Sequence, residues 1–313
     1  MGHRRQPNMK KPGLFIVILI CLIVFIFSLS AGIILAVRTT GWATLLDSSQ
    51  LPVRLGSLID RFKNGNWSAG EKLSIDETRS VDLADIQIIR ITSISEKITL
   101  TVGDTLVTAR LSGSYRTLGN PVAWNAKKDG HELLIYADYP RFGYYSSDLA
   151  IQVQVPAEYT GEVQIRTTSG DCLLSGQTEY SWSQLQFGSI SGNLQVDRAH
   201  IQSITFTNVS GSINLSACTG QVSGKTVSGA VQIDWVQFGA ADISTTSGDV
   251  QIRIPPETGL QLEYSTVSGS FQNQNLPLQI IRQTKRKLEG NLNQGTVPLQ
   301  VHTVSGNLTL SSS

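Results

Sequence analysis

A Ser-Gly pair that recurs in register seven times carries the residues of this 313-residue chain whose types could do chemistry. A serine can act as a nucleophile, and the residue after the glycine is an acid in two copies, Asp171 and Asp249. Two carboxyl groups within about 10 Å of each other can cleave a glycosidic bond. Whether these acids can act together depends on the elements that carry them. The seven pairs are Ser169–Gly170, Ser191–Gly192, Ser210–Gly211, Ser228–Gly229, Ser247–Gly248, Ser268–Gly269 and Ser305–Gly306.

The intervals between the pairs indicate a β-solenoid. Successive motif serines are 22, 19, 18, 19, 21 and 37 residues apart, and a period near 20 residues is typical of coils that bury their core only against their neighbours. Apolar residues alternate on both sides of each pair, so each coil has two short strands. The sequence therefore predicts an all-β fold, a parallel β-solenoid (β-helix) of coils about 18–22 residues long.

The alternation of apolar residues changes phase just before each pair, so we expect the chain to bend there. The glycine removes a side chain that would point into the corner, and the motif serines form a column. The last interval is about twice the period. It holds either an extra degenerate coil or a long insertion.

Catalysis is not expected from this arrangement. Asp171 and Asp249 lie four coils apart, about 19 Å at about 4.8 Å per rung, so they cannot share a substrate bond or a cation. The sequence predicts no enzyme, no cofactor, no metal site and no nucleic-acid partner. A polysaccharide-active β-helix enzyme is the least favoured alternative. The four histidines, which show no ligand spacing, are His3, His131, His200 and His302.

The N-terminal residues predict a membrane anchor. Residues 14–37 contain no charge and would span roughly 36 Å as a helix, enough for a hydrocarbon core of about 30 Å. Four basic residues and no acid precede or lie within this segment, which leaves 1 − 4 = −3 for the rest of the chain. We therefore expect a single-pass protein of the cell membrane with a cytoplasmic N-terminus and an extracellular C-terminal domain.

Changes in the sequence pattern divide the chain into five parts. A cytoplasmic basic tail (1–13) precedes the transmembrane helix (14–37), and a juxtamembrane stalk (38–80) follows, with a short amphipathic helix expected over 51–62. Short alternating runs over 81–160 predict a small β-sandwich-like head. The solenoid repeat domain takes 161–313.

The repeats resemble those of a bacterial family of unknown function, the putative adhesins, which have β-strand repeats with a T-[VT]-S-G-[DN] core. The strings TTSGD at 167–171 and 245–249 and TVSG at 226–229, 266–269 and 303–306 carry the resemblance. It covers about 81–313. It implies a β-solenoid with a small β head, frequently membrane-anchored, and supplies no catalytic residues. Some relatives are linked to envelope stress.

Two departures from the repeat are candidate binding sites. The first is a basic loop inside the long interval, which could contact an anionic envelope polymer or lipid headgroups. The second is an aromatic loop before the first repeat, which could stack against a sugar or a peptide. The alternatives are an ordinary solvated loop for the first and a cover for the end of the head for the second. The basic residues are Arg282, Lys285, Arg286 and Lys287, and the aromatic residues are Tyr136, Tyr139, Phe142, Tyr144 and Tyr145.

The sequence therefore predicts a non-catalytic protein that acts in adhesion or in binding and sensing of cell-envelope components. The alternative is a self-assembling envelope scaffold. Because the chain stops at a strand with no evident cap, we expect either that 276–298 folds over the C-terminal solenoid end or that this end is open for self-association through strand addition.

Overall fold

The computed structural model describes residues 71–313 apart from 104, 118–119, 141–143 and 176–180. These residues belong to one compact unit, Gly70–Ser313. The predicted basic tail, the transmembrane helix, the amphipathic helix at 51–62 and most of the stalk lie outside the described residues. Within 71–313 as described, all regular structure is strand, and no helix there could cross a membrane.

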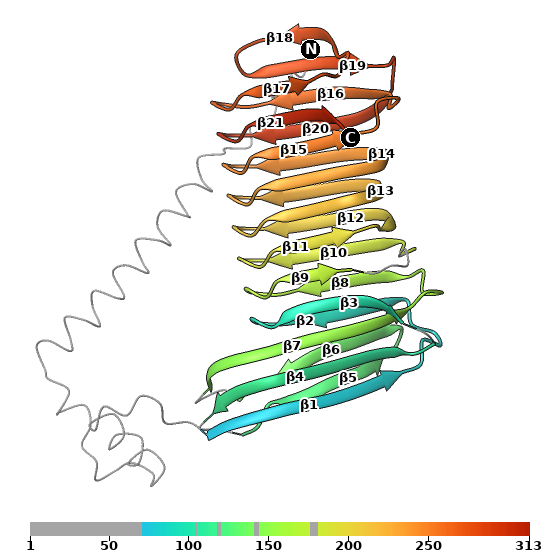
Figure 1. Ribbon diagram of the computed structural model, residues 1–313, viewed down its shortest axis with the longest axis vertical. Helices are drawn as coiled ribbons and strands as arrows, with labels where there is room; N and C mark the ends of the chain where they lie inside the picture. The colour runs from blue at the N-terminus through green and yellow to red at the C-terminus, as the bar shows by residue number, and fades with distance from the viewer. Residues whose placement is uncertain (1–70, 104, 118–119, 141–143, 176–180) are drawn as a thin grey trace, which may run out of the picture. The chain divides into compact units, whose positions relative to one another are not determined.

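The described unit is a stack of coils with two faces (Figure 1). Face A holds the strands that run into each Ser-Gly corner, and face B holds the strands that leave it. β13 and β14 pass around the opposite corner without a break, so each contributes to both faces. The coil strands are β2 (Ile88–Thr92), β3 (Lys97–Gly103), β8 (Glu162–Arg166), β9 (Cys172–Leu174), β10 (Gln184–Ser189), β11 (Leu194–Asp197), β12 (His200–Asn208), β13 (Ile213–Thr226), β14 (Val231–Thr245), β15 (Val250–Ile254), β16 (Leu260–Ser265), β17 (Phe271–Gln274), β20 (Val297–Thr303) and β21 (Leu308–Ser312).

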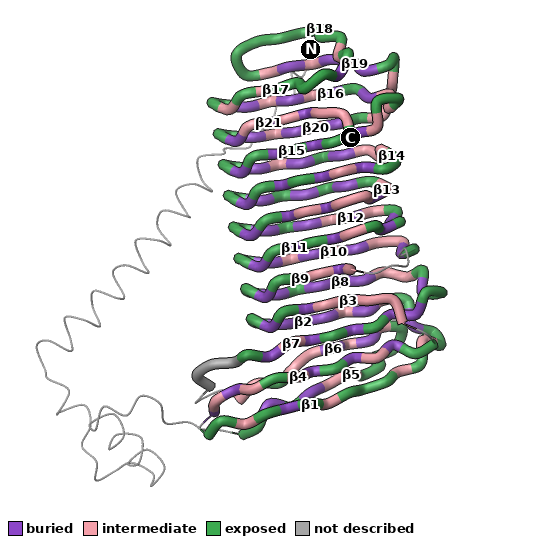
Figure 2. The backbone as a smooth tube through the Cα atoms, in the orientation of Figure 1, coloured by how far each residue is buried: buried purple, intermediate pink, exposed green. Residues whose placement is uncertain are grey.

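Neighbouring coils pair in parallel, as the repeat predicts. On face A, Phe187 of β10 lies between Ile165 of β8 and Phe206 of β12. These residues are buried, as are the other alternate positions of the coil strands (Figure 2). The core between the faces is almost entirely apolar. The core of the unit is internal to it, so we expect residues 70–313 to fold without the preceding segment.

The head is not a separate sandwich, because its strands extend both faces of the solenoid. β6 (Glu132–Asp138) pairs in parallel with β2, and β5 (Ala123–Asp129) closes face A antiparallel to β6. On face B, β7 (Tyr144–Pro156) pairs in parallel with β3. β4 (Val107–Thr117) and β1 (Glu71–Val81) follow antiparallel.

Two predicted boundaries change accordingly. β1 lies in the segment expected as stalk, yet pairs along its whole length with β4. The first coil is β2–β3, inside the segment expected as head, because these strands pair in parallel with β8 and β9. This coil has Glu96 where later coils have the motif glycine, so the Ser-Gly pattern does not detect it.

The motif glycines form a column of close backbone approaches. A Cβ atom on Gly229 would lie well inside 3.0 Å of the carbonyl oxygen of Gly211, and Gly211 meets Gly192 in the same way. Gly170, at the start of the column, meets the carbonyl of Glu96. Any side chain here would push two rungs apart, so the glycine sets the rung spacing at the corner.

The polar residues of the motif hold the same corner together. At five corners a buried Thr or Ser two residues before the motif serine accepts the glycine N–H, as in the 2.8 Å bond from Gly170 N to Thr167 Oγ1. The motif serines donate their N–H to a carbonyl of the preceding rung, as Ser228 does to Val209 at 2.9 Å. The hydroxyls of Ser169, Ser191, Ser210, Ser228 and Ser268 donate to the same carbonyls.

The last coil in the sequence is not the last coil in space. β20–β21 lies between β14–β15 and β16–β17, because β20 pairs with both β14 and β16 and β21 pairs with both β15 and β17. The glycine column shows the same order, because Gly306 lies against the Gly248 carbonyl and Gly269 lies against the Gly306 carbonyl. The chain therefore skips one rung after β15 and fills it at the end.

The 37-residue interval caps the end of face A. β18 (Gln279–Gln283) and β19 (Lys287–Leu292) form a hairpin, and β19 pairs antiparallel with β16. Leu276 is buried and Leu278 packs against the core, so the link from β17 covers the end of the core. Residues 276–298 were expected either to fold over the C-terminal solenoid end or to leave that end open. They form a cover as far as Leu292, and the residues that follow begin the inserted coil.

The glycine column predicts a large effect of one added methyl group. Changing Gly229→Ala should lower the free energy of unfolding by about 2–3 kcal/mol or more, because the new Cβ overlaps the Gly211 carbonyl. Urea unfolding followed by circular dichroism measures the change. Gly188→Ala is the matched control, because its Cβ would meet only the Arg166 side chain at 3.9 Å. Equal effects of the two substitutions would contradict the role given to the column.

The inserted coil predicts an unusual response to truncation. Removing residues 297–313 deletes an internal rung and separates β15 from β17, so we expect loss of cooperative unfolding and aggregation. Thermal melts and light scattering measure both. A shortened protein that melts cooperatively and stays monomeric would contradict the observed coil order.

Candidate binding site at the C-terminal end of the solenoid

The residues first considered for catalysis have structural roles. Asp171 Oδ1 accepts the N–H of Asn193 at 2.9 Å, and Asn193 Oδ1 in turn accepts the N–H of Ser212 at 2.8 Å. Asp249 is linked to Asn307 in the same way at 2.8 Å. Each of these side chains ties one rung to the next. Among the described residues, no group of three or more His, Cys, Asp or Glu could hold a metal ion.

Part of the aromatic loop packs against the protein itself. Tyr139 is partly buried against the core, and its hydroxyl lies at the carboxylate of Glu96. Tyr136 lies within β6 and is half-buried. Phe142 lies outside the described residues, as do the side chains of Tyr144 and Tyr145 at the start of β7. For Tyr139 the structure favours the covering role.

Glu96 closes the corner of the first coil. Its side chain is 1% exposed, and Oε2 accepts hydrogen bonds from Ser93 Oγ at 2.8 Å and from the Ile94 amide at 2.9 Å. Burial alone would raise the pKa of Glu96. Hydrogen bonds from Tyr139, Ser93 and Ile94 outweigh it, and the pKa is lowered below its usual value. The carboxylate can replace the glycine because no earlier Ser-Gly corner stacks beneath it.

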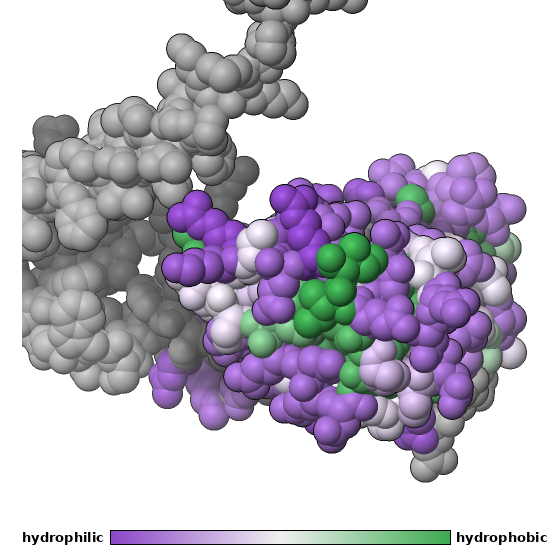
Figure 3. All heavy atoms as spheres, turned by 90° about the horizontal axis from the view of Figure 1, so that it is seen from above, coloured by the Kyte–Doolittle hydropathy of each residue, from purple (hydrophilic) through white to green (hydrophobic). Residues whose placement is uncertain are grey.

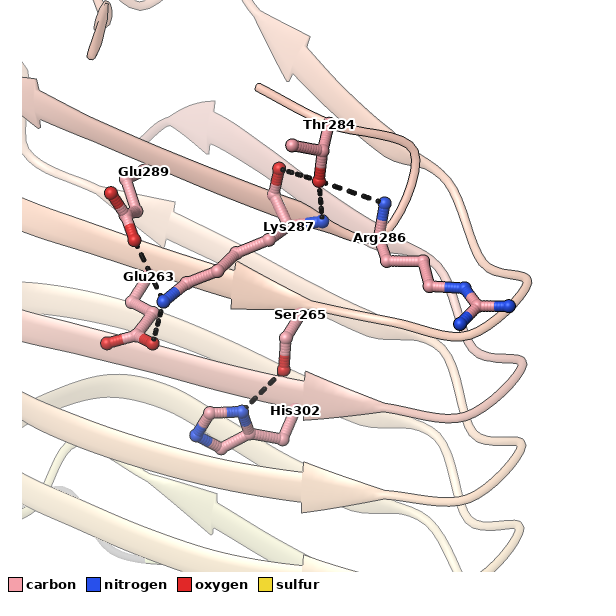
Figure 4. A network of polar contacts seen from close by, with 7 residues as sticks. All are labelled: Glu263, Ser265, Thr284, Arg286, Lys287, Glu289 and His302. Carbon is pink, nitrogen blue, oxygen red and sulfur yellow. Dashed lines mark hydrogen bonds and ion pairs between the residues drawn. The ribbon is translucent and has the colours of Figure 1, made fainter. Parts of the chain in front are cut away.

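The four basic residues of the predicted loop lie on the β18–β19 hairpin, but they are not equivalent. Arg282 lies on β18, Lys285 and Arg286 are exposed in the turn, and Lys287 begins β19. Lys287 Nζ forms ion pairs with Glu263 at 2.9 Å and Glu289 at 2.8 Å (Figure 4). Its charge is therefore largely neutralised, and these partners raise its pKa.

The turn that carries Lys285 and Arg286 is well defined. Thr284 Oγ1 accepts the N–H of Arg286 at 3.3 Å and that of Lys287 at 2.9 Å (Figure 4). The Thr284 amide donates to the Lys287 carbonyl at 2.8 Å. Two cations are thus presented on a fixed turn at the end of the coil stack.

Sequence reasoning missed an apolar component beside these charges. Ile280 and Ile281 on the edge strand β18 are 51% and 64% exposed. Seen end-on, the molecule shows a hydrophobic patch surrounded by hydrophilic residues (Figure 3). The signal was present in the string LQIIRQ, where two isoleucines are adjacent and so cannot both face the core of a strand. We call the surface formed by residues 276–286 the end face.

A groove of about 370 Å³ lies beside the end face, over β16, β19 and β20. Its polar wall is rich in acceptors, and among the described residues Asn291 Oδ1 is a buried acceptor without a hydrogen-bond partner. Ile281 is its apolar edge. The lining of the groove includes Gln261, Glu263, Ile281, Glu289, Asn291 and Gln300.

Comparisons with known proteins agree with this fold. The family model described as Toastrack DUF4097 matches residues 145–311, and no curated protein matches the chain. Solved structures that match the chain include a "putative cell adhesion protein" from Clostridium sporogenes, 9% identical with a TM-score of 0.37 over 77% of this chain and 100% of that one.

Two further solved structures are similar. A "putative adhesin" from Bacteroides fragilis is 11% identical, with a TM-score of 0.40 over 78% of this chain and 99% of its own. A "putative lipid binding protein" from Parabacteroides distasonis is 12% identical, with a TM-score of 0.38 over 76% and 96%. At these identities and TM-scores the matches say nothing of function.

Glu96 predicts a pH-dependent contribution to stability. Because its pKa is lowered in the folded state, the carboxylate stabilises the fold above its unfolded pKa of about 4.3, and this is lost as the pH falls through the lower folded value. Glu96→Gln should destabilise the protein by about 1–3 kcal/mol at pH 7 and by less near pH 3. Unfolding titrations at both pH values measure this. Glu257→Gln, which removes an exposed carboxylate, is the control. An effect of Glu96→Gln that does not depend on pH would contradict the assignment.

Proposed function

The chain belongs to the Toastrack DUF4097 family, and from this premise we propose that it is a non-catalytic binding protein of a bacterial cell envelope. It is anchored in the membrane by residues 14–37 and presents the solenoid outside the cell. Its role is adhesion, or sensing of an envelope component during envelope stress. The anchor and the location rest on the charge and hydropathy pattern of the N-terminal residues.

The observation that carries this proposal is the basic and apolar end face. Along the coils, the polar residues of the motif are engaged in contacts between rungs, as the bonds of Ser228 and Asp171 show. On the end face, by contrast, Lys285, Arg286 and two isoleucines are exposed together. A rigid stack that ends in such a surface is suited to binding at its end.

The engaged motif residues also support a non-catalytic role. Hydrolysis of a glycan needs an acid and a base within reach of one bond, and Asp171 and Asp249 bond to separate rungs.

A self-assembling scaffold is the second candidate, because β17 and β18 are open edges at this end. Light scattering of residues 70–313 separates the two. A monomer at all concentrations removes the scaffold, and concentration-dependent growth supports it.

The binding function predicts the outcome of a screen. Residues 70–313, tested against purified envelope polymers, lipid vesicles and antimicrobial peptides, should bind at least one class saturably. Incubation with cell-wall glycans should release no new reducing ends. Absence of saturable binding to every class, or release of reducing ends, would contradict the proposed function.

A further inference from the structure

We propose that the end face docks on a lipid bilayer that contains anionic lipid, with Ile280 and Ile281 entering the interface and Lys285 and Arg286 contacting headgroup phosphates. This inference rests on the proposed function and names the envelope component that the same site would bind.

The apolar half of the argument is the pair of isoleucines. Apolar residues are also exposed at the corners, where Ile190, Val209 and Val227 hold the same position on successive rungs and are 56%, 44% and 48% exposed. On the end face two isoleucines are adjacent, with Leu278 packed beneath the same surface. The resulting patch occupies the end of the stack and is ringed by hydrophilic residues (Figure 3). Such a patch, rimmed by polar groups, is typical of a protein or membrane contact.

The charged half is the β18–β19 turn. Lys287 forms ion pairs with Glu263 and Glu289. Arg282 lies opposite Glu289 in the strand pairing, and after Lys287 its charge also lowers the pKa of the Glu289 carboxylate. Lys285 and Arg286 have no ion-pair partner among the described residues. Both extend from a turn fixed by Thr284. Each free cation near an anionic bilayer strengthens binding about fivefold.

Among the described residues, the edge strands at the opposite end of the stack lack this combination. These strands, β1 and β5, carry charges of both signs, including Lys72 and Asp76 on β1 and Lys128 and Asp129 on β5. Such charges protect exposed sheet edges from unwanted contacts. The edge strand β18 has no acid, and β17 has no charge at all.

A second copy of this chain fits the end face less well than a bilayer. The pairing of β18 with β19 shifts register between Ile280 and Arg282, a bulge that disfavours addition of another strand. Two end faces brought together would also oppose their cations. A charged polymer in water would engage Lys285 and Arg286 but leave the isoleucines in solvent. A bilayer interface satisfies both components.

Vesicle co-sedimentation of residues 70–313 tests the inference, because this fragment lacks the apolar segment 14–37. We expect binding to vesicles of equal phosphatidylglycerol and phosphatidylcholine, and much weaker binding to phosphatidylcholine alone. The double variant Ile280→Ser, Ile281→Ser should bind at least tenfold more weakly. The double variant Lys285→Ser, Arg286→Ser should lose about 25-fold at low salt.

Matched controls lie away from the end face. Ile190→Ser removes an equally exposed isoleucine, and the double variant Lys127→Ser, Lys128→Ser removes two exposed cations from β5. Both should bind within twofold of the parent. Tryptophan at the tip gives a second readout: Ile281→Trp emission should shift to the blue on anionic vesicles, and Ile190→Trp emission should not. Thermal melts establish that each variant is folded.

Three results would overturn the inference. Vesicle binding unaffected by the isoleucine substitutions, with no blue shift, would reduce the contact to surface charge. Binding of another envelope class without vesicle binding would exclude the bilayer while leaving the proposed function intact. Self-association abolished by the isoleucine substitutions would make a second copy the occupant. Failure to bind any envelope class would reject the proposed function as well.

Discussion

The fold depends on how closely successive rungs approach at the Ser-Gly corner. At each motif glycine the Cα faces the carbonyl oxygen of the preceding corner, at a distance that leaves no room for a methyl group. Parallel strand pairing then continues from this contact on both faces. The N–H of the motif serine and, at five corners, the hydroxyl two residues earlier satisfy backbone groups that the bend would otherwise leave unpaired. A stack of coils is stable only if these groups are satisfied at every rung, which explains why the motif recurs.

The same constraint makes the two ends of the stack the places where the pattern must change. At the start, Glu96 occupies the glycine position and its carboxylate accepts the amides of the bend. At the other end, an antiparallel hairpin stops parallel stacking on face A, and the last coil enters one rung below. This arrangement ties the C-terminal strand between two neighbours instead of leaving it as an edge.

The sequence predicted the repeat unit and its two strands well, because alternation and the Ser-Gly pair are local signals. It did not predict coil order, because β20–β21 carries the same motif wherever it inserts. It missed the β2–β3 coil because Glu96 replaces the glycine, and it missed the pairing of β1 because that strand lies in a polar segment. The basic residues were located, but the neutralisation of Lys287 depends on Glu263, which is distant in sequence.

The proposed recognition at the end face agrees with what the corners require. Within the stack, residues beside the bend must form hydrogen bonds to the rung below. Their polar groups are therefore constrained by the fold and cannot readily be changed to suit a ligand. The β18–β19 turn has a rung on one side only; the Thr266 N–H of that rung donates to the Arg286 carbonyl, and Thr284 fixes the turn from within. Lys285, Arg286 and the isoleucines of β18 can therefore be chosen for a partner without disturbing the coils. The cap that ends the solenoid is thus also the part of it that is most free to bind.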